Sequence, residues 1–308
     1  MSLFLHTTRG ILFWLACISA GWAAVPDIGP AEVYTQALLI EQETEIIRRH
    51  FNITTKITYT PLQTEVKPRH VWQKTYQLLM KINVFRRLHG LTSIAPTATE
   101  PMSNVEARMV WSQTQRILTE IRILRRHLGI PGEPVSTPHP EEKKPLDVYN
   151  KLNEILALWG GLIGAGFTPS HVYSEVLRLN KDVDGILLQL KIFDSAAPPP
   201  RKEEADVNET LGLAFEVMDE IQRLQRLANI ETTDFSALHK TEGIVPADVF
   251  NLIDMALAEL DTIKAKIGLI HSVTPIAEYF EDKTPADVAQ TLGYLANKLR
   301  LIKSLRTD

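Results

Sequence analysis

Apolar residues recur along most of the chain at alternating steps of four and three residues, the spacing of one face of an α-helix. After Val249, for example, the pattern runs through Ile253, Ala256, Leu260, Ile263, Ile267 and Ile270. A mean period of 3.5 residues is typical of helices that pack side by side with a left-handed supercoil. The pattern therefore predicts an all-α protein built from bundles with left-handed coiled packing.

Each apolar stretch begins with a related group of residues, and Thr284-Pro285-Ala286-Asp287-Val288 is the clearest copy. A threonine caps a helix start, and proline fits the first helical position because no N–H is needed there. The carboxylate of Asp287, at the third position, can accept the cap N–H and faces the positive end of the helix dipole. Seven further copies begin at Pro30, Pro68, Pro101, Pro145, Pro169, Glu204 and Pro246.

The motifs and stripes together predict eight helices. They span residues 30–51, 68–89, 103–128, 145–163, 169–193, 203–228, 246–269 and 285–305. The third helix departs from the rule, because its apolar stripe passes through Ala107, Val110 and Thr114 and is out of frame with Val105. The motif therefore does not fix where this helix begins.

The two halves of the chain resemble each other. The motif at Pro30 matches that at Pro169, 139 residues later, and the motif at Pro145 matches that at Pro285, 140 residues later. This spacing predicts an internal duplication, with one four-helix unit at 24–166 and another at 167–308. Most connections are Pro-rich and roughly 10 to 17 residues long, beyond the 2–8 that neighbouring antiparallel helices need, so crossovers between parallel helices remain open.

The N-terminal segment has the pattern of a secretory signal. Arg9 precedes an apolar run at 11–20, and Gly21-Trp22-Ala23 then offers small residues at the two positions that a signal peptidase reads. This pattern predicts a signal peptide over 1–23 and a periplasmic or secreted protein. An alternative is a degenerate lipobox that ends at Cys17, which would anchor a lipoprotein at that residue. Cys17 is the only cysteine, so a protein cleaved after it has no disulfide. No later segment is apolar enough to predict a transmembrane span.

Charge differs between the halves of this 308-residue chain. From Pro30 to Thr168 there are 17 basic and 13 acidic residues, and from Pro169 onward there are 15 and 23. Unlike charges on the halves would favour mutual docking, although solvated faces explain them equally well. The net charge of −4 argues against a nucleic-acid partner.

Aromatic residues follow the motif valine in five helices. They are Tyr34, Trp72, Tyr149, Tyr173 and Phe250. Two histidines, His70 and His171, stand where other copies of the motif have the third-position acid. If the helix starts gather at one end of each bundle, these seven side chains are candidates for a ligand-binding pocket. The alternative interpretation is structural: aromatic side chains that pack the helices and histidines that replace the capping acid.

Arginine pairs occupy the last turns of the first three predicted helices. They are Arg48 with Arg49, Arg86 with Arg87, and Arg125 with Arg126. Cations at these positions complement the negative end of a helix dipole. Alternatively, if the three helix ends lie together, the pairs form an anion-binding site.

No motif for a nucleophile, a metal or a haem occurs in a plausible setting, so we expect no catalytic residues, no metal and no cofactor. The sequence favours an exported, non-catalytic helical protein that binds or scaffolds through helix surfaces and loops. The expected partner is another protein of the cell envelope. The alternative is a small-ligand or sensor-type helical module with an aromatic-lined pocket.

Overall fold

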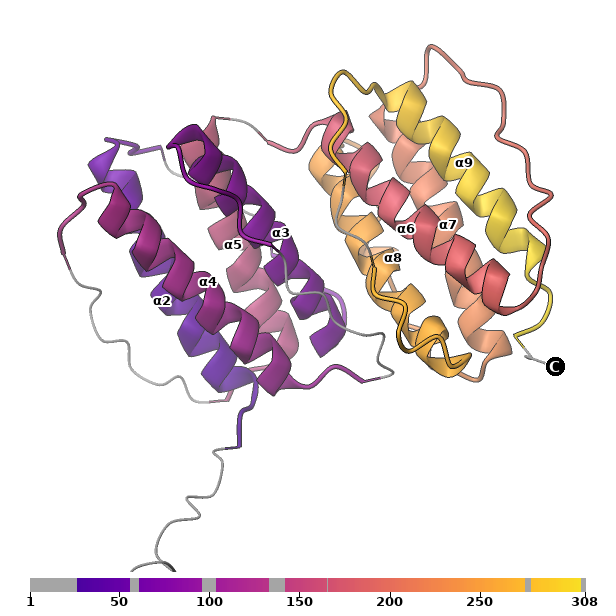
Figure 1. Cartoon of the computed structure of the whole chain (residues 1–308), viewed down its shortest axis with the longest axis horizontal. Coiled ribbons are helices and arrows are strands. Elements are labelled where there is room, and N and C mark those ends of the chain that lie inside the picture. The colour runs from indigo at the N-terminus through magenta and orange to yellow at the C-terminus, as the bar shows by residue number, and fades with distance from the viewer. Residues whose placement is uncertain are drawn as a thin grey trace, which may run out of the picture.

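The computed structural model describes residues 27–55, 61–95, 104–132, 142–164, 166–274 and 278–305. These residues form eight α-helices, one 3₁₀-helix (Ser236–Leu238) and no strand, which confirms the all-α prediction (Figure 1). The α-helices are α2 (Pro30–His50), α3 (Pro68–Leu88), α4 (Ala107–His127), α5 (Pro145–Ile163), α6 (Pro169–Gln189), α7 (Val207–Leu227), α8 (Pro246–Lys266) and α9 (Pro285–Leu301). None of these described helices is both long and apolar enough to cross a bilayer. The predicted signal peptide and Cys17 lie outside the described residues.

The helices pack in two groups of four, α2–α5 (the N-terminal group) and α6–α9 (the C-terminal group). In the N-terminal group, α2 and α3 each pack against both α4 and α5. In the C-terminal group, α6 and α7 each pack against both α8 and α9. The first two helices of each group are therefore diagonal neighbours, and so are the last two. Contact between α3 and α8 joins the groups (Figure 1).

All four helices within each group run parallel. At one end of the N-terminal group, the first and fourth residues of its four helices line a single cavity of about 20 Å³. These residues are Pro30, Val33, Pro68, Val71, Ala107, Val110, Pro145 and Val148. The equivalent eight residues of α6–α9 line a cavity of about 10 Å³. Helix starts thus meet at one end of each group, which settles the open question of crossovers: the long connections carry the chain back along the bundle.

The eight helices share one register, counted from their observed first residues. Positions 4, 8, 11 and 15 of every helix are no more than 3% exposed. In α2 they are Val33, Ala37, Ile40 and Thr44, and in α5 they are Val148, Leu152, Ile155 and Trp159. Across the core, Trp159 Nε1 donates a hydrogen bond of 3.0 Å to Thr44 Oγ1. The predicted stripes therefore describe the cores, and their common register follows from the common helix start.

Two predicted helix starts are wrong. Helix α4 begins at Ala107 and not at residue 103, so Ala107 takes the position of the motif proline and Val110 that of the motif valine. Helix α7 begins at Val207 and not at residue 203, because the side chain of Asp206 caps it by accepting the N–H of Glu209 at 2.9 Å. Asp206 does not act at the third position as predicted, and Thr210 occupies the core position assigned to Val207.

The proposed role of the motif acid is confirmed where it is clearest. Asp287 Oδ2 accepts the backbone N–H of Thr284 at 2.8 Å, and the Thr284 hydroxyl accepts the N–H of Asp287. Glu32, Asp147 and Asp248 accept the N–H of their own cap residues in the same way. Each of these contacts satisfies a backbone donor that the helix leaves unpaired.

The six helices that precede long connections all end alike. The second residue after each helix has a positive φ, and the N–H of the next residue returns to a carbonyl of the last turn, which is the Schellman arrangement. The positive-φ residues are Asn52, Gly90, Gly129, Lys191, Asn229 and Gly268, and an isoleucine or leucine follows each one. This ending turns the chain sharply back over its own bundle.

The connection between α6 and α7 shows how a return segment is held. It runs along α9, where Gln290 Nε2 donates to the carbonyl of Pro199 at 3.0 Å and Tyr294 OH donates to Asp194 at 3.1 Å. Gly293 lies beneath Pro199, and a Cβ at this glycine would stand 2.9 Å from the proline Cγ. A glycine is therefore required where the proline ring crosses the helix.

We expect Gly293→Ala to lower the free energy of unfolding by about 1–2 kcal/mol, because the new methyl group overlaps Pro199. Gly212→Ala is the matched control, since Gly212 also lies inside a helix but has nothing within 4 Å of the added Cβ. This control should stabilise the protein by roughly 0.5–1 kcal/mol through its helix propensity. Urea titration measures both changes, and equal shifts in the two variants would contradict the assigned contact.

Candidate functional site

The five aromatic candidates do not share one site in the described structure. Tyr149 and Phe250 are buried between the two helix groups, whereas Trp72 packs at the edge of the core. Tyr34 lies under Lys143, with the ammonium 4.6 Å from the ring centroid, and Tyr173 lies under Lys283 at 4.7 Å. The residue after the core valine points about 100° away from the core, so these side chains flank the bundles and do not line the end cavities.

Both candidate histidines act at their helix starts as the motif acid does elsewhere. His70 Nδ1 accepts the backbone N–H of Lys67 at 3.0 Å, and His171 Nδ1 accepts that of Thr168 at 3.2 Å. Burial, together with the nearby charges of Lys81 and Arg87, lowers the pKa of His171 to about 4. These contacts agree with the structural interpretation of the two histidines.

The parallel helices bring the three arginine pairs to one end of the N-terminal group. One member of each pair turns inward: Arg48 binds Glu45 at 2.7 Å, Arg86 binds Glu120 at 3.2 Å and Arg125 binds Glu43 at 2.5 Å. The other members, Arg49, Arg87 and Arg126, are exposed. The last turns of α7, α8 and α9 also carry Lys or Arg. Because aligned helix dipoles add, cations at this end are favoured in both groups.

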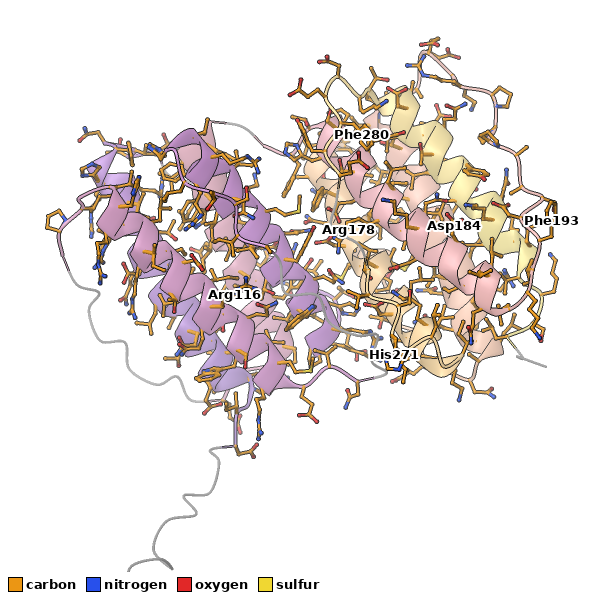
Figure 2. The ribbon with its side chains drawn as sticks, in the orientation of Figure 1. Arg116, Arg178, Asp184, Phe193, His271 and Phe280 are labelled. Atoms are coloured by element: carbon orange, nitrogen blue, oxygen red, sulfur yellow. The ribbon has the colours of Figure 1, made fainter. Side chains whose placement is uncertain are left out.

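The richest cluster of polar side chains lies where α3 meets α8, and we call it the junction. Helix α3 runs antiparallel to α8 there, so the start of α3 faces the later turns of α8. Figure 2 shows Arg178 in the space between the two groups. The junction contains three successive clusters of contacts along α3, centred on Glu259, Lys74 and Phe167.

The first cluster surrounds the buried carboxylate of Glu259 on α8. Arg69 donates to both of its oxygens at 2.9–3.0 Å, and His70 Nε2 lies 2.5 Å from Oε1. Gln225 Nε2 from α7 donates to Oε2. Because His70 Nδ1 accepts the N–H of Lys67, the Nε2 atom carries the proton that His70 shares with Glu259. Side chains from α3 and α7 therefore converge on one carboxylate of α8.

Electrostatics keep Glu259 ionised. Burial alone raises the pKa of its carboxyl, but the hydrogen bonds from His70 and Gln225 and the charge of Arg69 outweigh burial and lower the pKa to about 2. Burial lowers the pKa of His70, despite its hydrogen bond to Glu259. The cluster is thus an Arg–Glu ion pair with a neutral histidine hydrogen-bonded to it.

The second cluster is centred on Lys74 of α3, which is 1% exposed. Its Nζ donates to Gln77 Oε1 at 2.8 Å and to Asn251 Oδ1 of α8 at 2.9 Å, and it lies 4.6 Å from the centroid of the Tyr149 ring. Asp254 of α8 is buried beside it, and neither carboxylate oxygen of Asp254 has a hydrogen-bond partner among the described residues. Lys74 is therefore surrounded by amide oxygens and an aromatic ring.

Helix α6 adds a buried ion pair to the second cluster. Arg178 binds Glu175 at 2.5 Å, and its guanidinium carbon lies 4.0 Å from the centroid of the Tyr76 ring on α3. Burial and the negative charge of Glu175 raise the pKa of Asp254 well above its usual range. Burial also raises the pKa of Glu175, despite the opposing effect of Arg178.

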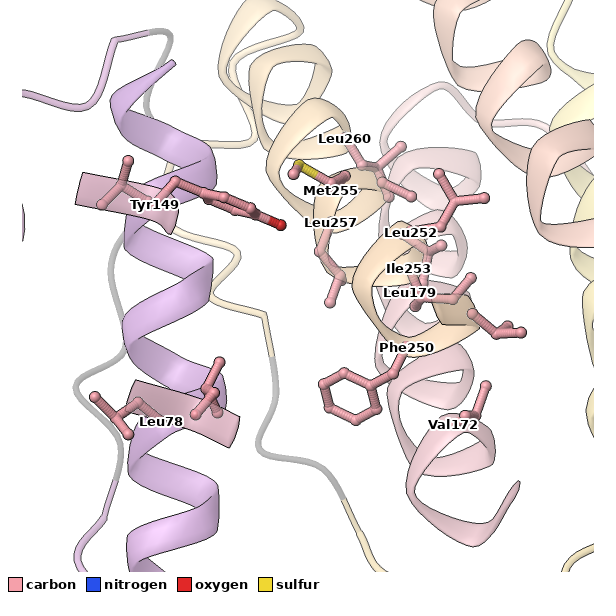
Figure 3. Packing of buried hydrophobic residues seen from close by; sticks show 14 of the residues in the cluster. Leu78, Tyr149, Val172, Leu179, Phe250, Leu252, Ile253, Met255, Leu257 and Leu260 are labelled. Atoms are coloured by element: carbon pink, nitrogen blue, oxygen red, sulfur yellow. The ribbon is translucent and has the colours of Figure 1, made fainter. Parts of the chain in front are cut away.

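The third cluster is aromatic and lies at the short joint between the groups. Phe167 stacks on Phe250 with ring centroids 4.0 Å apart, and Lys81 Nζ lies 4.3 Å from the Phe167 centroid. Figure 3 shows Tyr149 directed from the N-terminal group toward Met255 and Leu257 of α8. Apolar contacts between the two groups therefore lie beside the polar clusters of Glu259 and Lys74.

The sequence analysis missed the junction, although a signal for it was present. In α3, polar residues at Lys74, Gln77 and Lys81 recur at helical spacing beside the core stripe, and all three are buried. Helix α8 is apolar on more than one face, which is typical of a helix covered on several sides. Helices α3 and α8 each have a second buried face, and contact between these two faces joins the groups.

The polar side chains of the junction bind one another, and they leave no open cavity for a substrate. Among the described residues, no three His, Cys, Asp or Glu side chains lie close enough together to hold a metal ion. Comparisons with known protein families, curated proteins and solved structures found no match for this chain. The function must therefore be argued from the molecule itself.

Proposed function

We propose that the protein is an exported, non-catalytic binding or scaffold protein whose partner is another protein of the cell envelope. On this proposal, residues 24–166 and 167–308 are duplicated four-helix units with left-handed coiled packing. The shared register and the repeated helix ends support the duplication. Filled bundle cores support a role for outer surfaces, because the end cavities of about 20 and 10 Å³ hold no more than a water molecule.

The observation that carries the proposal is a set of exposed apolar side chains at or just after the carboxyl ends of three helices of the C-terminal group. Leu188 is 80% exposed in the last turn of α6, and Phe193 is 85% exposed in the connection four residues after that helix. Leu227 and Ile270, at the ends of α7 and α8, are also exposed. Because the four helices are parallel, these ends lie on the same side of the bundle. Exposed aromatic and aliphatic side chains of this kind are typical of protein interfaces.

We expect a photo-cross-linking residue at Lys191, which is exposed between Leu188 and Phe193, to capture one envelope protein in living cells. The double variant Leu188→Ser/Phe193→Ser should lose most of that adduct, because it removes the apolar anchors. Leu88→Ser is the matched control, since Leu88 is 66% exposed at the end of α3 in the other group. No defined adduct, or an adduct that the double variant retains, would contradict the proposal.

Export rests on the predicted signal peptide and is tested separately. Mass spectrometry of the mature protein should find an N-terminus near residue 24. A lipid attached at Cys17 would instead place the protein on a membrane surface, and an intact N-terminus would contradict export.

A second candidate function is small-ligand binding, and an open cleft supports it. Residues 63–68 and 144–146 line this cleft, whose volume is about 550 Å³. Thermal-shift screening with small metabolites tests the candidate. A compound that raises the Tm of the wild type but not of Lys144→Ala would favour ligand binding over scaffolding.

A further inference from the structure

Buried lysines in this protein have two kinds of surroundings. Lys264 is buried inside the C-terminal group and binds two carboxylates, Asp182 at 2.9 Å and Asp261 at 3.1 Å. Lys298 likewise binds Asp184 and Asp194. Lys74, at the junction, instead donates to two amide oxygens and faces a tyrosine ring. A buried ammonium without a bonded carboxylate is unfavourable, whereas an uncharged amine has two N–H groups for these two acceptors.

The charged groups around Lys74 come from two elements of the C-terminal group. Helix α8 contributes Asp254, which attracts an ammonium but accepts no hydrogen bond from Lys74. Helix α6 contributes Glu175, which is already bound to Arg178. Helix α5 contributes the Tyr149 ring. The polar groups contributed by α3 itself and by α8, Gln77 and Asn251, are uncharged. Nothing in this arrangement gives a protonated Lys74 a direct ionic partner.

We propose that the junction is a pH-sensitive latch, in which uncharged Lys74 holds α3 against α8 and protonation of Lys74 releases the two helix groups from each other. The helices themselves remain folded, because their cores do not include Lys74. The groups then stay connected through the short joint between α5 and α6. This inference concerns the relation between the groups and is independent of the proposed partner.

The direction of the pH effect follows from two lysines. Burial lowers the pKa of Lys74 to about 7, with some opposition from Asp254, and burial lowers that of Lys81 to about 8. Once released into water, each returns to the ordinary value of 10.5. Lysines with a depressed pKa stabilise the closed form above pH 10.5, and this stability is lost as the pH falls toward 7. From Lys74 alone, the closed-to-open ratio should therefore fall roughly 10- to 100-fold between pH 9 and pH 7, and Lys81 should add a factor of roughly 10.

Other titrating groups at the junction modify this effect. His70 and His171 have lowered pKa values, so their protonation below pH 6.5 also favours opening. Asp254 and Glu175 have raised pKa values, so their protonation favours the closed form as the pH falls. Glu259 loses its charge only toward pH 2. We therefore place the test between pH 7 and pH 9.5, above the range of the two histidines, and the variant Asp254→Asn removes the opposing titration of Asp254.

The experiment measures energy transfer between dyes on the outer faces of the two groups. The full chain carries Cys17→Ser, with Ser112→Cys on α4 and Asp219→Cys on α7, both exposed positions. We expect the transfer efficiency to fall as the pH is lowered from 9.5 to 7, while circular dichroism shows unchanged helix content. Efficiency that stays constant over this range would overturn the proposal.

Two variants and a control assign the effect to Lys74. Lys74→Met should lose most of the fall in transfer efficiency and keep only the smaller contribution of Lys81, whereas Lys181→Met, which changes an exposed lysine of α6, should keep the wild-type profile. Asp254→Asn should make the closed-to-open ratio fall further toward pH 7, because removing a charge that favours protonated Lys74 lowers the pKa of Lys74 in the closed form. This variant serves if Lys74→Met fails to fold. A Lys74→Met or Asp254→Asn profile identical to that of the wild type would overturn the proposal.

Discussion

Glu259→Ala is expected to lower the free energy of unfolding by about 3–5 kcal/mol at pH 7. The substitution leaves the buried donors of Arg69, His70 and Gln225 without their shared acceptor, and breaking one side of a buried ion pair costs this much. Urea titration at pH 7 measures the change. Glu216→Ala is the control, because Glu216 makes an exposed ion pair with Arg300, and it should cost less than about 1 kcal/mol.

Acid should remove the same stability from the wild type. The folded pKa of Glu259, about 2, lies below its ordinary value of 4.5. Its contribution is therefore present above pH 4.5 and is lost as the pH falls through about 2. The stability difference between wild type and Glu259→Ala should shrink over this range. A difference that stays constant from pH 7 to pH 2.5 would show that Glu259 is not bound as an anion.

Trp159→Ala should have an effect of similar size inside the N-terminal group. Trp159 is fully buried, donates to Thr44 and contacts Phe85 edge to face with ring centroids 5.5 Å apart. Removing it opens a large cavity and leaves the Thr44 hydroxyl without its donor, so we expect a loss of about 3–5 kcal/mol in the free energy of unfolding. Thermal and urea unfolding both report this loss.

Trp72→Ala is the control for Trp159→Ala, because Trp72 follows a core valine and is only partly buried. We expect less than half the loss seen for Trp159→Ala. Equal losses would mean that the shared register does not define the core.

The sequence predicted the helices and their core faces because both depend on local rules. Proline at the first helical position and an acid at the third mark a start with little ambiguity, and the four-three stripe marks the buried face. The two errors, at the starts of α4 and α7, occur where the proline is misplaced or missing. In α7 a side-chain cap, Asp206, replaces the proline signal and shifts the start by four residues.

Helix direction could not be predicted from the stripes, because a stripe reads the same in a parallel and an antiparallel bundle. The long connections did indicate crossovers, and Asn or Gly before Ile or Leu, which occurs at five of the six helix ends, is a further sequence signal of a sharp reversal. The aromatic pocket depended on side chains such as Tyr34 and Tyr173 pointing inward. One residue past a core position, a helix instead directs them to its flank.

Periodicity gave only an indirect signal of the junction, because buried polar residues such as Lys74 and Gln77 look like solvent-exposed ones in a sequence. Their burial depends on α3 and α8 meeting, which is a property of two groups far apart in the chain. The arginine pairs, in contrast, were recognisable from the sequence. Their placement at helix ends was clear from the sequence, and parallel packing then brings them together.

The central claim is that all helices in each group run parallel, and spin-label distances test it most directly. In a Cys17→Ser background, labels at Ala31 and Arg108 mark the starts of α2 and α4, and labels at Ala31 and Arg126 mark opposite ends. Helices α2 and α4 are neighbours, and 18 residues separate Arg108 from Arg126, or about 27 Å of helix. Parallel packing predicts that the Ala31–Arg108 distance is much the shorter of the two. A shorter Ala31–Arg126 distance would contradict the account.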